Sequence, residues 1–119
     1  MQAAARNVTR VVLELGGKSP ALVLADCDLD ATVDSVFGAI FENAGQICSA
    51  GSRLVIARAI HDRFVERLAA RAAALTLGHG LRNPGMGPVN SRAQRSRIES
   101  MVNAAVARGV RVARIRCMS

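Results

Sequence analysis

The feature that most constrains the fold of this chain is an apolar stripe of helical spacing that lies between two short apolar runs. The runs, residues 21–25 and 53–57, have the length and the side chains that are typical of strands. Asp28 precedes the stripe and is suited to cap a helix. The stripe repeats at i, i+4, i+7, i+8, i+11 and i+12 and consists of Leu29, Val33, Val36, Phe37, Ile40 and Phe41.

The same alternation of strand and helix patterns continues along the chain. Residues 8–15 are rich in β-branched and aliphatic side chains and end at Gly16-Gly17, which indicates a buried strand followed by a tight turn. Runs such as 21–25, without polar alternation, suit a sheet covered on both faces. Helical spacing returns over residues 61–75.

The last third begins with an irregular stretch rich in Gly and Pro over residues 78–90. Ser91 and Gln94 then have the form of a capping box, and the helix that they begin is expected to end at Gly109. Residues 110–115 are a candidate last strand. Together these patterns predict an α/β fold with a mostly parallel sheet and flanking helices.

Composition indicates a globular chain with a lean core. The 119 residues fit one domain, half of them are hydrophobic, and the chain has three Phe but no Trp or Tyr. The N-terminus lacks the apolar core of a signal peptide, and no stretch approaches the roughly 20 apolar residues that cross a bilayer. We therefore expect a soluble, cytoplasmic protein of marginal stability without a membrane partner.

Charge and cysteine content argue against two further classes of site. The net charge of +7 is concentrated in residues 91–119, which hold seven Arg and one acidic residue, Glu99. No aromatic residue lies among those arginines for base stacking, so nucleic acid is not expected as a partner. Cys27, Cys48 and Cys117 are odd in number and lack metal-ligand spacing, so neither a disulfide framework nor a metal site is predicted.

Two local clusters contain the residues that could carry chemistry, and each is ambiguous alone. Glu14 lies in an apolar run, where a carboxylate is either a structural hydrogen-bond acceptor or a general base. Cys48 follows a Gly45-Gln46 turn that could expose it as a nucleophile, although buried structural cysteines are common. Gly16-Gly17-Lys18-Ser19 does not form a phosphate-binding loop, because position 12 is Val12 rather than Gly.

Taken together, the two clusters resemble the paired motif of the aldehyde dehydrogenase superfamily. They read Glu-Leu-Gly-Gly-Lys-Ser-Pro over residues 14–20 and Phe-x-Asn-x-Gly-Gln-x-Cys over residues 41–48, with Glu14 and Cys48 34 positions apart. The likeness continues through Asp28-Leu29-Asp30, Arg53, residues 62–68 and Gly87-Pro88, and so covers about residues 3–112.

The resemblance implies an enzyme that oxidises a small-molecule aldehyde to a carboxylic acid with NAD or NADP. By resemblance, Cys48 attacks the aldehyde carbon as a thiolate, giving a thiohemiacetal and then a thioester, and Glu14 activates the water that hydrolyses the thioester. The backbone amide of Cys48 would help to hold the oxyanion. Leu15 and Gly16 would contact the cofactor, with the Leu15 carbonyl near the nicotinamide carboxamide.

The resemblance also implies that residues 1–119 are a truncated catalytic domain that cannot assemble a full cofactor site and is weak or inactive alone. Residues 78–81, Gly-His-Gly-Leu, depart from the family pattern, and residues 113–119 match none of it, which suggests an out-of-frame tail. The alternative is a non-catalytic remnant that acts as an interaction or structural protein, either as a homo-oligomer or paired with a full-length paralogue.

Overall fold

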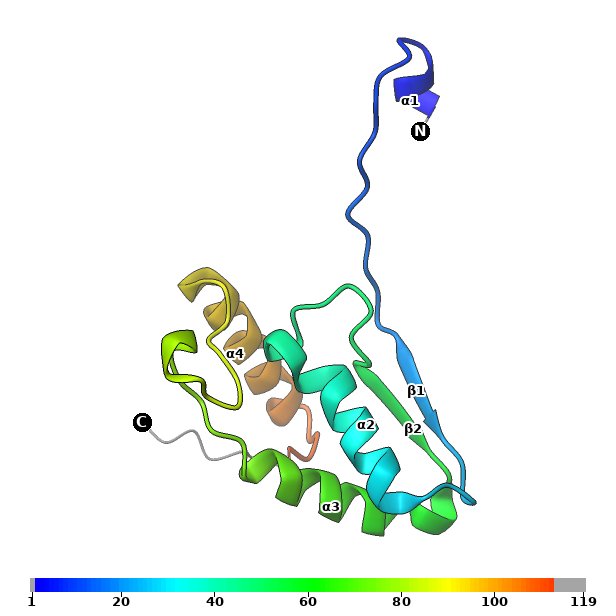
Figure 1. Cartoon of the computed structure of the whole chain (residues 1–119), viewed down its shortest axis with the longest axis vertical. Helices are drawn as coiled ribbons and strands as arrows, with labels where there is room; N and C mark the ends of the chain where they lie inside the picture. The colour runs from blue at the N-terminus through cyan, green and yellow to red at the C-terminus, as the bar shows by residue number, and fades with distance from the viewer. Residues whose placement is uncertain (1, 113–119) are drawn as a thin grey trace.

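Two parallel strands covered by two helices make up the packed part of the computed structural model, which describes residues 2–112 (Figure 1). β1 and β2 pair in parallel, with Pro20 opposite Arg53 and Val23 opposite Ile56. The predicted α/β fold with a parallel sheet and flanking helices is confirmed. In chain order the elements are α1 (Gln2–Ala5), β1 (Pro20–Val23), α2 (Leu29–Phe41), η1 (Glu42–Gly45), β2 (Arg53–Ile56), η2 (Arg58–Ile60), α3 (His61–Ala73), η3 (Gly80–Arg82) and α4 (Arg92–Ala107).

Helix α2 follows the predicted stripe. The carboxylate of Asp28 accepts a hydrogen bond from the Ala31 amide at 3.1 Å, which satisfies one of the amides that a helix start leaves without an intrahelical partner. Three residues of the stripe, Val33, Val36 and Phe37, are buried. The helix ends where the backbone turns left-handed, so the predicted helix and its two ends are confirmed.

The core lies between one face of the sheet and the helices α2 and α3. It consists of Val23, Val33, Val36, Ile60 and Phe64, of which Phe64 is fully buried. Within residues 2–112, no other large side chain is buried as completely, so the core is lean. Because most of the apolar burial is concentrated around one aromatic ring, this part of the molecule depends strongly on that ring.

Charged side chains join α2 to α3 at the edge of this core. Arg67 of α3 pairs with Asp30 of α2, and Arg71 pairs with Asp34 one turn further along at 3.2 Å. The Arg71 guanidinium also lies 4.5 Å from the centre of the Phe37 ring. The two helices are thus held by partly exposed contacts around a small apolar centre.

The opposite face of the sheet is uncovered within residues 2–112. Leu22 and Val55 alternate along the strands with the residues that pack on the core, and they are 69% and 53% exposed. The expectation of a sheet covered on both faces is therefore wrong for this chain. The reason is that α2 and α3 both pack on the face that carries Val23, which leaves only solvent on the other.

The segment before β1 is an extended arm that projects from the packed part (Figure 1). Residues 9–19 have no regular secondary structure, and Val8 and Val12 are about nine-tenths exposed. The predicted buried strand over residues 8–15 is therefore wrong. A strand is stable only when a neighbour satisfies its backbone groups and covers its apolar side chains, and within residues 2–112 no strand lies beside it.

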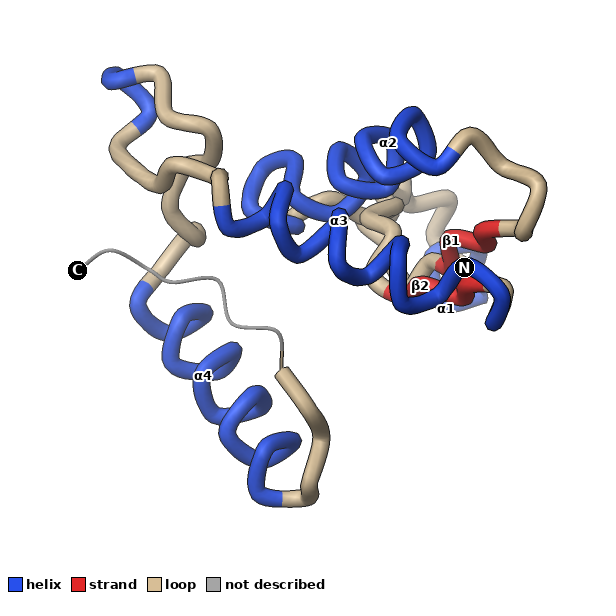
Figure 2. The backbone as a smooth tube through the Cα atoms, turned by 90° about the horizontal axis from the view of Figure 1, so that it is seen from below, coloured by secondary structure: helices blue, strands red, loops and turns tan. Residues whose placement is uncertain are grey.

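The C-terminal third contains the predicted irregular stretch and the predicted last helix. The Ser91 hydroxyl accepts from the Gln94 amide at 3.2 Å and caps α4, which stops before Gly109 at a φ of +84°. Helix α4 has no buried residue and stands apart from α2 and α3 (Figure 2). Residues 110–112 form no strand, and residues 113–115 of that predicted element lie outside the described residues.

Two further features concern membranes and metals. Between residues 2 and 112, no helix combines the length and the apolar character that a membrane crossing requires. In the same part of the chain, no group of three or more His, Cys, Asp or Glu side chains is placed to hold a metal ion.

Candidate active site

Cys48 lies in a tight turn and is exposed. The turn is closed by a hydrogen bond from the Ala50 amide to the Ile47 carbonyl at 3.1 Å, and Cys48 is the first of its two central residues. A thiol in this position is open to a reagent from solvent. By contrast, Cys27 is half-buried and packs against the core, and Cys117 lies outside the described residues.

The backbone before Cys48 is left-handed at three consecutive residues. Asn43, Ala44 and Gly45 have φ values of +49°, +56° and +73°. A Cβ atom on Gly45 would lie 3.1 Å from the carbonyl oxygen of Ile40, so both the backbone angle and the space favour glycine there. This turn carries the chain from α2 to the exposed thiol, as the Gly45-Gln46 pair predicted.

Gln46 holds this turn from both sides. Its Nε2 atom donates to the Asn43 carbonyl at 3.0 Å, and its Oε1 atom accepts from the backbone amide of Asn90 at 2.8 Å. The Asn43 side chain returns a hydrogen bond to the Gln46 carbonyl at 3.2 Å. The sequence places Gln46 in a motif but gives no signal for Asn90, which lies 44 positions away.

The arm that carries Glu14 passes directly beside Cys48. A Cβ atom on Gly16 would lie 3.5 Å from the Cys48 carbonyl oxygen and 3.8 Å from its Cβ atom. Because two residues of extended chain span at most about 7 Å, the Glu14 backbone lies within that distance of Gly16. The two clusters, which are far apart in the sequence, therefore meet in space.

Arg53 fastens the arm to the sheet. Its Nε atom donates to the Lys18 carbonyl at 2.7 Å, and its backbone amide donates to the Ser19 carbonyl at 3.2 Å. Arg53 is the first residue of β2, only five positions after Cys48, so the bond also fixes where the arm crosses the cysteine turn. The role of Arg53 as an anchor was not predicted from the sequence.

Glu14 and Leu15 are exposed, which corrects the expectation that the carboxylate is buried in a strand. Among residues 2–112, the Glu14 side chain has no hydrogen-bond or ion-pair partner, and the Leu15 side chain is 73% exposed. The Leu15 carbonyl likewise accepts no hydrogen bond from this part of the chain. Both groups are therefore available to a ligand or to solvent beside Cys48.

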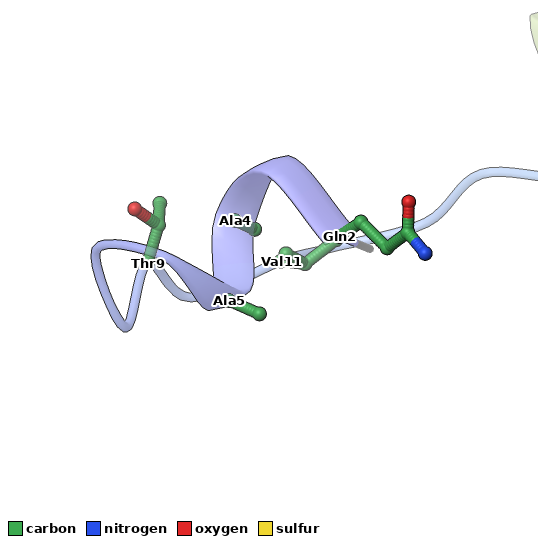
Figure 3. Close-up of a pocket in the computed structure, with 5 residues that line it drawn as sticks. All are labelled: Gln2, Ala4, Ala5, Thr9 and Val11. Carbon is green, nitrogen blue, oxygen red and sulfur yellow. The ribbon is translucent and has the colours of Figure 1, made fainter.

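Two hollows elsewhere are poorer candidates for chemistry. One, of about 540 Å³, lies at the far end of the arm, and its lining residues Gln2, Ala4, Ala5, Thr9 and Val11 include no titratable side chain (Figure 3).

The other hollow, of about 550 Å³, lies between Ala44 and residues 77–89. Its two polar side chains already have partners, since His79 accepts from the Leu81 amide and Arg95 donates to Glu99. Neither hollow brings a nucleophile and a base together.

Comparison with known proteins gives one consistent family. Residues 1–114 match the model of the family described as "Aldehyde dehydrogenase family". The chain is 42% identical to the betaine aldehyde dehydrogenase of Bacillus subtilis over 113 residues, which is 94% of this chain and 23% of that protein. The chain thus spans about a quarter of the length of this relative.

Solved structures agree with this match. The crystal structure of lactaldehyde dehydrogenase from Escherichia coli superposes with a TM-score of 0.86 at 38% identity, covering 95% of this chain and 24% of that one. A betaine aldehyde dehydrogenase from Staphylococcus aureus, solved in complex with NAD+, gives 0.81 at 41% identity, covering 91% and 22%. The fold of this chain therefore corresponds to one continuous part of those proteins.

Proposed function

The chain belongs to the aldehyde dehydrogenase family, and from this premise we propose that it carries the nucleophile and the base for the NAD(P)-dependent oxidation of an aldehyde to a carboxylic acid. Cys48 is the nucleophile and Glu14 is the base. The proposal rests mainly on the contact between Gly16 and Cys48, which brings together two clusters that are 34 positions apart. The substrate class is defined only by its aldehyde group, which the names of the betaine aldehyde and lactaldehyde dehydrogenases share.

The first half of the reaction takes place on Cys48. Its thiolate adds to the aldehyde carbon, a carbon–sulfur bond forms, and the carbonyl electron pair moves to oxygen. The backbone amide of Cys48 donates a hydrogen bond to that oxyanion. When the oxygen pair returns to restore the C=O bond, the aldehyde hydrogen leaves with its electron pair and a thioester remains on Cys48. NAD(P)+, when bound, supplies the acceptor for this hydride.

The second half of the reaction depends on Glu14. Its carboxylate takes a proton from a water molecule as the water oxygen adds to the thioester carbon. The carbon–sulfur bond then breaks, the thiolate of Cys48 is restored, and the carboxylic acid leaves. Because Glu14 is exposed, it can pass the proton to solvent before the next cycle.

Leu15 and Gly16 suit the nicotinamide end of the cofactor. The Leu15 carbonyl is a free acceptor for the amide N–H of a carboxamide, and it lies one residue from the Gly16 backbone that contacts Cys48. The space beside Gly17 is open, since a Cβ atom there would meet nothing within 4 Å. We assign only this end of the cofactor to the chain.

An activated aryl ester gives the sharpest test, because it acylates a thiol directly to the thioester and needs no hydride acceptor. We expect the purified, reduced chain to be acylated at Cys48 and to turn over slowly. Cys48→Ala should lose acylation, and Glu14→Gln should accumulate the acyl-enzyme, as measured by intact mass and aryl alcohol release. Cys27→Ala is the matched control and should behave like the parent chain.

Oxidation of an aldehyde, followed by NAD(P)H absorbance with NAD+ or NADP+, tests the complete reaction with the same variants. Acylation that persists in Cys48→Ala, or an acyl-enzyme that is hydrolysed equally fast in Glu14→Gln, would contradict the assignment of these two roles.

A second candidate function is a non-catalytic interaction role, and the uncovered sheet face favours it. Leu22, Leu24 and Val55 together form an exposed apolar surface. Under this alternative the chain self-associates or pairs with a related chain, and Leu22→Lys with Val55→Lys shifts it toward a monomer in sedimentation velocity. Self-association combined with ester turnover no faster than in Cys48→Ala would favour this role over catalysis.

A further inference from the structure

Gln46 joins the turn that presents Cys48 to a segment much further along the chain. Its carboxamide uses both ends, with Nε2 donating to the Asn43 carbonyl at 3.0 Å and Oε1 accepting from the Asn90 amide at 2.8 Å. Because donor and acceptor are both engaged, the orientation of the carboxamide is determined rather than free. Gln46 itself is half-buried, so these bonds compete with water less than those of an exposed side chain would.

The backbone that Gln46 holds is unusual. Asn43 and Ala44 are left-handed although neither is glycine, and such conformations persist only where the surroundings impose them. Two hydrogen bonds join the side chain of Gln46 or Asn43 to the backbone carbonyl of the other, and the Gln46 amide donates to the same Asn43 carbonyl at 3.1 Å. These local bonds shape the turn, and only the bond to Asn90 ties it to another part of the fold.

The Asn90 bond acts two residues before the thiol. The turn that contains Cys48 is itself closed by a single hydrogen bond, from the Ala50 amide to the Ile47 carbonyl, so its direction depends on the backbone that enters it. On the other side, Asn90 precedes the Ser91 cap of α4 and follows the 78–90 stretch. A change on either side of the bond therefore alters the angle at which the Cys48 turn leaves Gln46.

We propose that Gln46 is a positioning residue for Cys48, and that it fixes the direction of the thiol by clamping the cysteine turn to the backbone amide of Asn90. The proposal rests on the proposed function of Cys48 as the nucleophile. Gln46 touches neither substrate nor cofactor in this role. Its effect is on the environment of the thiol and on the angle of attack.

The alkylation rate of Cys48 relative to Cys27 in the same molecule separates this role from a purely structural one. Partial unfolding exposes both thiols and moves the ratio toward one at every pH, whereas a misdirected turn changes Cys48 alone and changes its pH dependence. Iodoacetamide is the probe, and peptide mass mapping from about pH 6 to about pH 9 covers the range in which thiols titrate. Circular dichroism establishes that each variant is folded.

Gln46→Ala is expected to change the ratio of Cys48 to Cys27 alkylation and to displace its pH profile. Gln46→Glu keeps an acceptor for Asn90 but loses the donor to Asn43, so it should have an intermediate effect. Gln94→Ala makes the same change at an exposed glutamine of α4 and should leave the ratio unchanged. An unchanged ratio and pH profile in folded Gln46→Ala would overturn the proposal.

A second pair of variants tests the clamp from its other end and serves if Gln46→Ala does not fold. Asn90→Pro removes the amide that donates to Gln46, whereas Asn90→Ala retains it. We expect Asn90→Pro to shift Cys48 reactivity in the same direction as Gln46→Ala, and Asn90→Ala to match the parent chain. Equal behaviour of the two Asn90 variants would contradict the clamp.

The aryl ester assay distinguishes failure of the clamp from failure of the proposed function. A clamp-dependent alkylation profile in a chain that is never acylated at Cys48 would support positioning and would remove the nucleophilic role on which its purpose depends. Acylation at Cys48 that is insensitive to both Gln46→Ala and Asn90→Pro would support the nucleophile and exclude the positioning residue. A misplaced thiol is expected to slow acylation by up to about 100-fold.

Discussion

Residues 8–15 and helix α2 are both rich in apolar side chains, but only α2 buries them. Val33 and Val36 of α2 are 5% and 8% exposed, whereas Val8 and Val12 of the arm are 90% and 88% exposed. A helix satisfies its backbone hydrogen bonds internally and needs only one packed face, while a strand depends on a neighbour for both. The same kind of apolar sequence therefore folds in one region and remains an extended arm in the other.

This difference determines where the candidate site lies. Cys48 is placed by the packed region, through the turn that leaves α2, and Glu14 is placed by the arm (Figure 1). The two regions meet where Gly16 contacts Cys48 and where Arg53 binds the Lys18 carbonyl. Substitutions in the core, at the turn, at the arm anchor and at the helix edge probe this division in order of decreasing effect.

The largest effect is expected in the core, from Phe64→Ala. Phe64 is fully buried, so its removal leaves a cavity and should lower the free energy of unfolding by about 3–5 kcal/mol. Val12→Ala in the exposed arm is the control and should change it by about 0.5 kcal/mol or less. Urea denaturation followed by circular dichroism measures both. Similar losses in the two variants would mean that the arm is packed.

The turn between the two regions should respond to Gly45→Ala. A φ of +73° and a carbonyl oxygen 3.1 Å from the new Cβ atom both oppose alanine, so the free energy of unfolding should fall by about 1–2 kcal/mol. Gly38→Ala is the matched control inside α2, where a Cβ atom meets nothing within 4 Å, and it should stabilise by about 0.5–1 kcal/mol. Thermal denaturation that shows the same sign for both would contradict this account of the turn.

The arm anchor should respond to Arg53→Ala. Loss of the bond to the Lys18 carbonyl should reduce stability by about 1 kcal/mol and should free the arm. Trypsin is then expected to cleave after Arg10 and Lys18 faster, as measured by mass spectrometry, while Arg58→Ala leaves the rate unchanged. An unchanged cleavage rate in Arg53→Ala would show that Arg53 does not hold the arm.

The smallest effect is expected at the edge of the helix pair, from Asp34→Asn. The Arg71–Asp34 pair is more than half exposed on both sides, at 51% and 69%, so its loss should cost roughly 0.2–1 kcal/mol. The difference from the parent chain should shrink in high salt, because exposed ion pairs are screened. Urea denaturation at two ionic strengths tests this, and a salt-independent difference would argue against an electrostatic origin.

Local patterns predicted the helices well and the strands only in part. The Asp28 and Ser91 caps are formed by bonds within three residues, so a window of sequence contains all that is needed to find them. The strand over residues 8–15 was predicted wrongly, because its fate depends on a neighbour that no local pattern reports. The family was evident from two motifs, although neither motif was informative alone.

The sequence by itself determined which segments become helices, which residues turn the chain, and which family the two motifs indicate, because these depend on residues near one another in the chain. Only the tertiary structure decided that Glu14 is exposed, that Gly16 lies against Cys48, and that Gln46 binds the Asn90 amide. Those features join residues that lie more than 30 positions apart, and their formation depends on how the packed region places the cysteine turn and the arm in space.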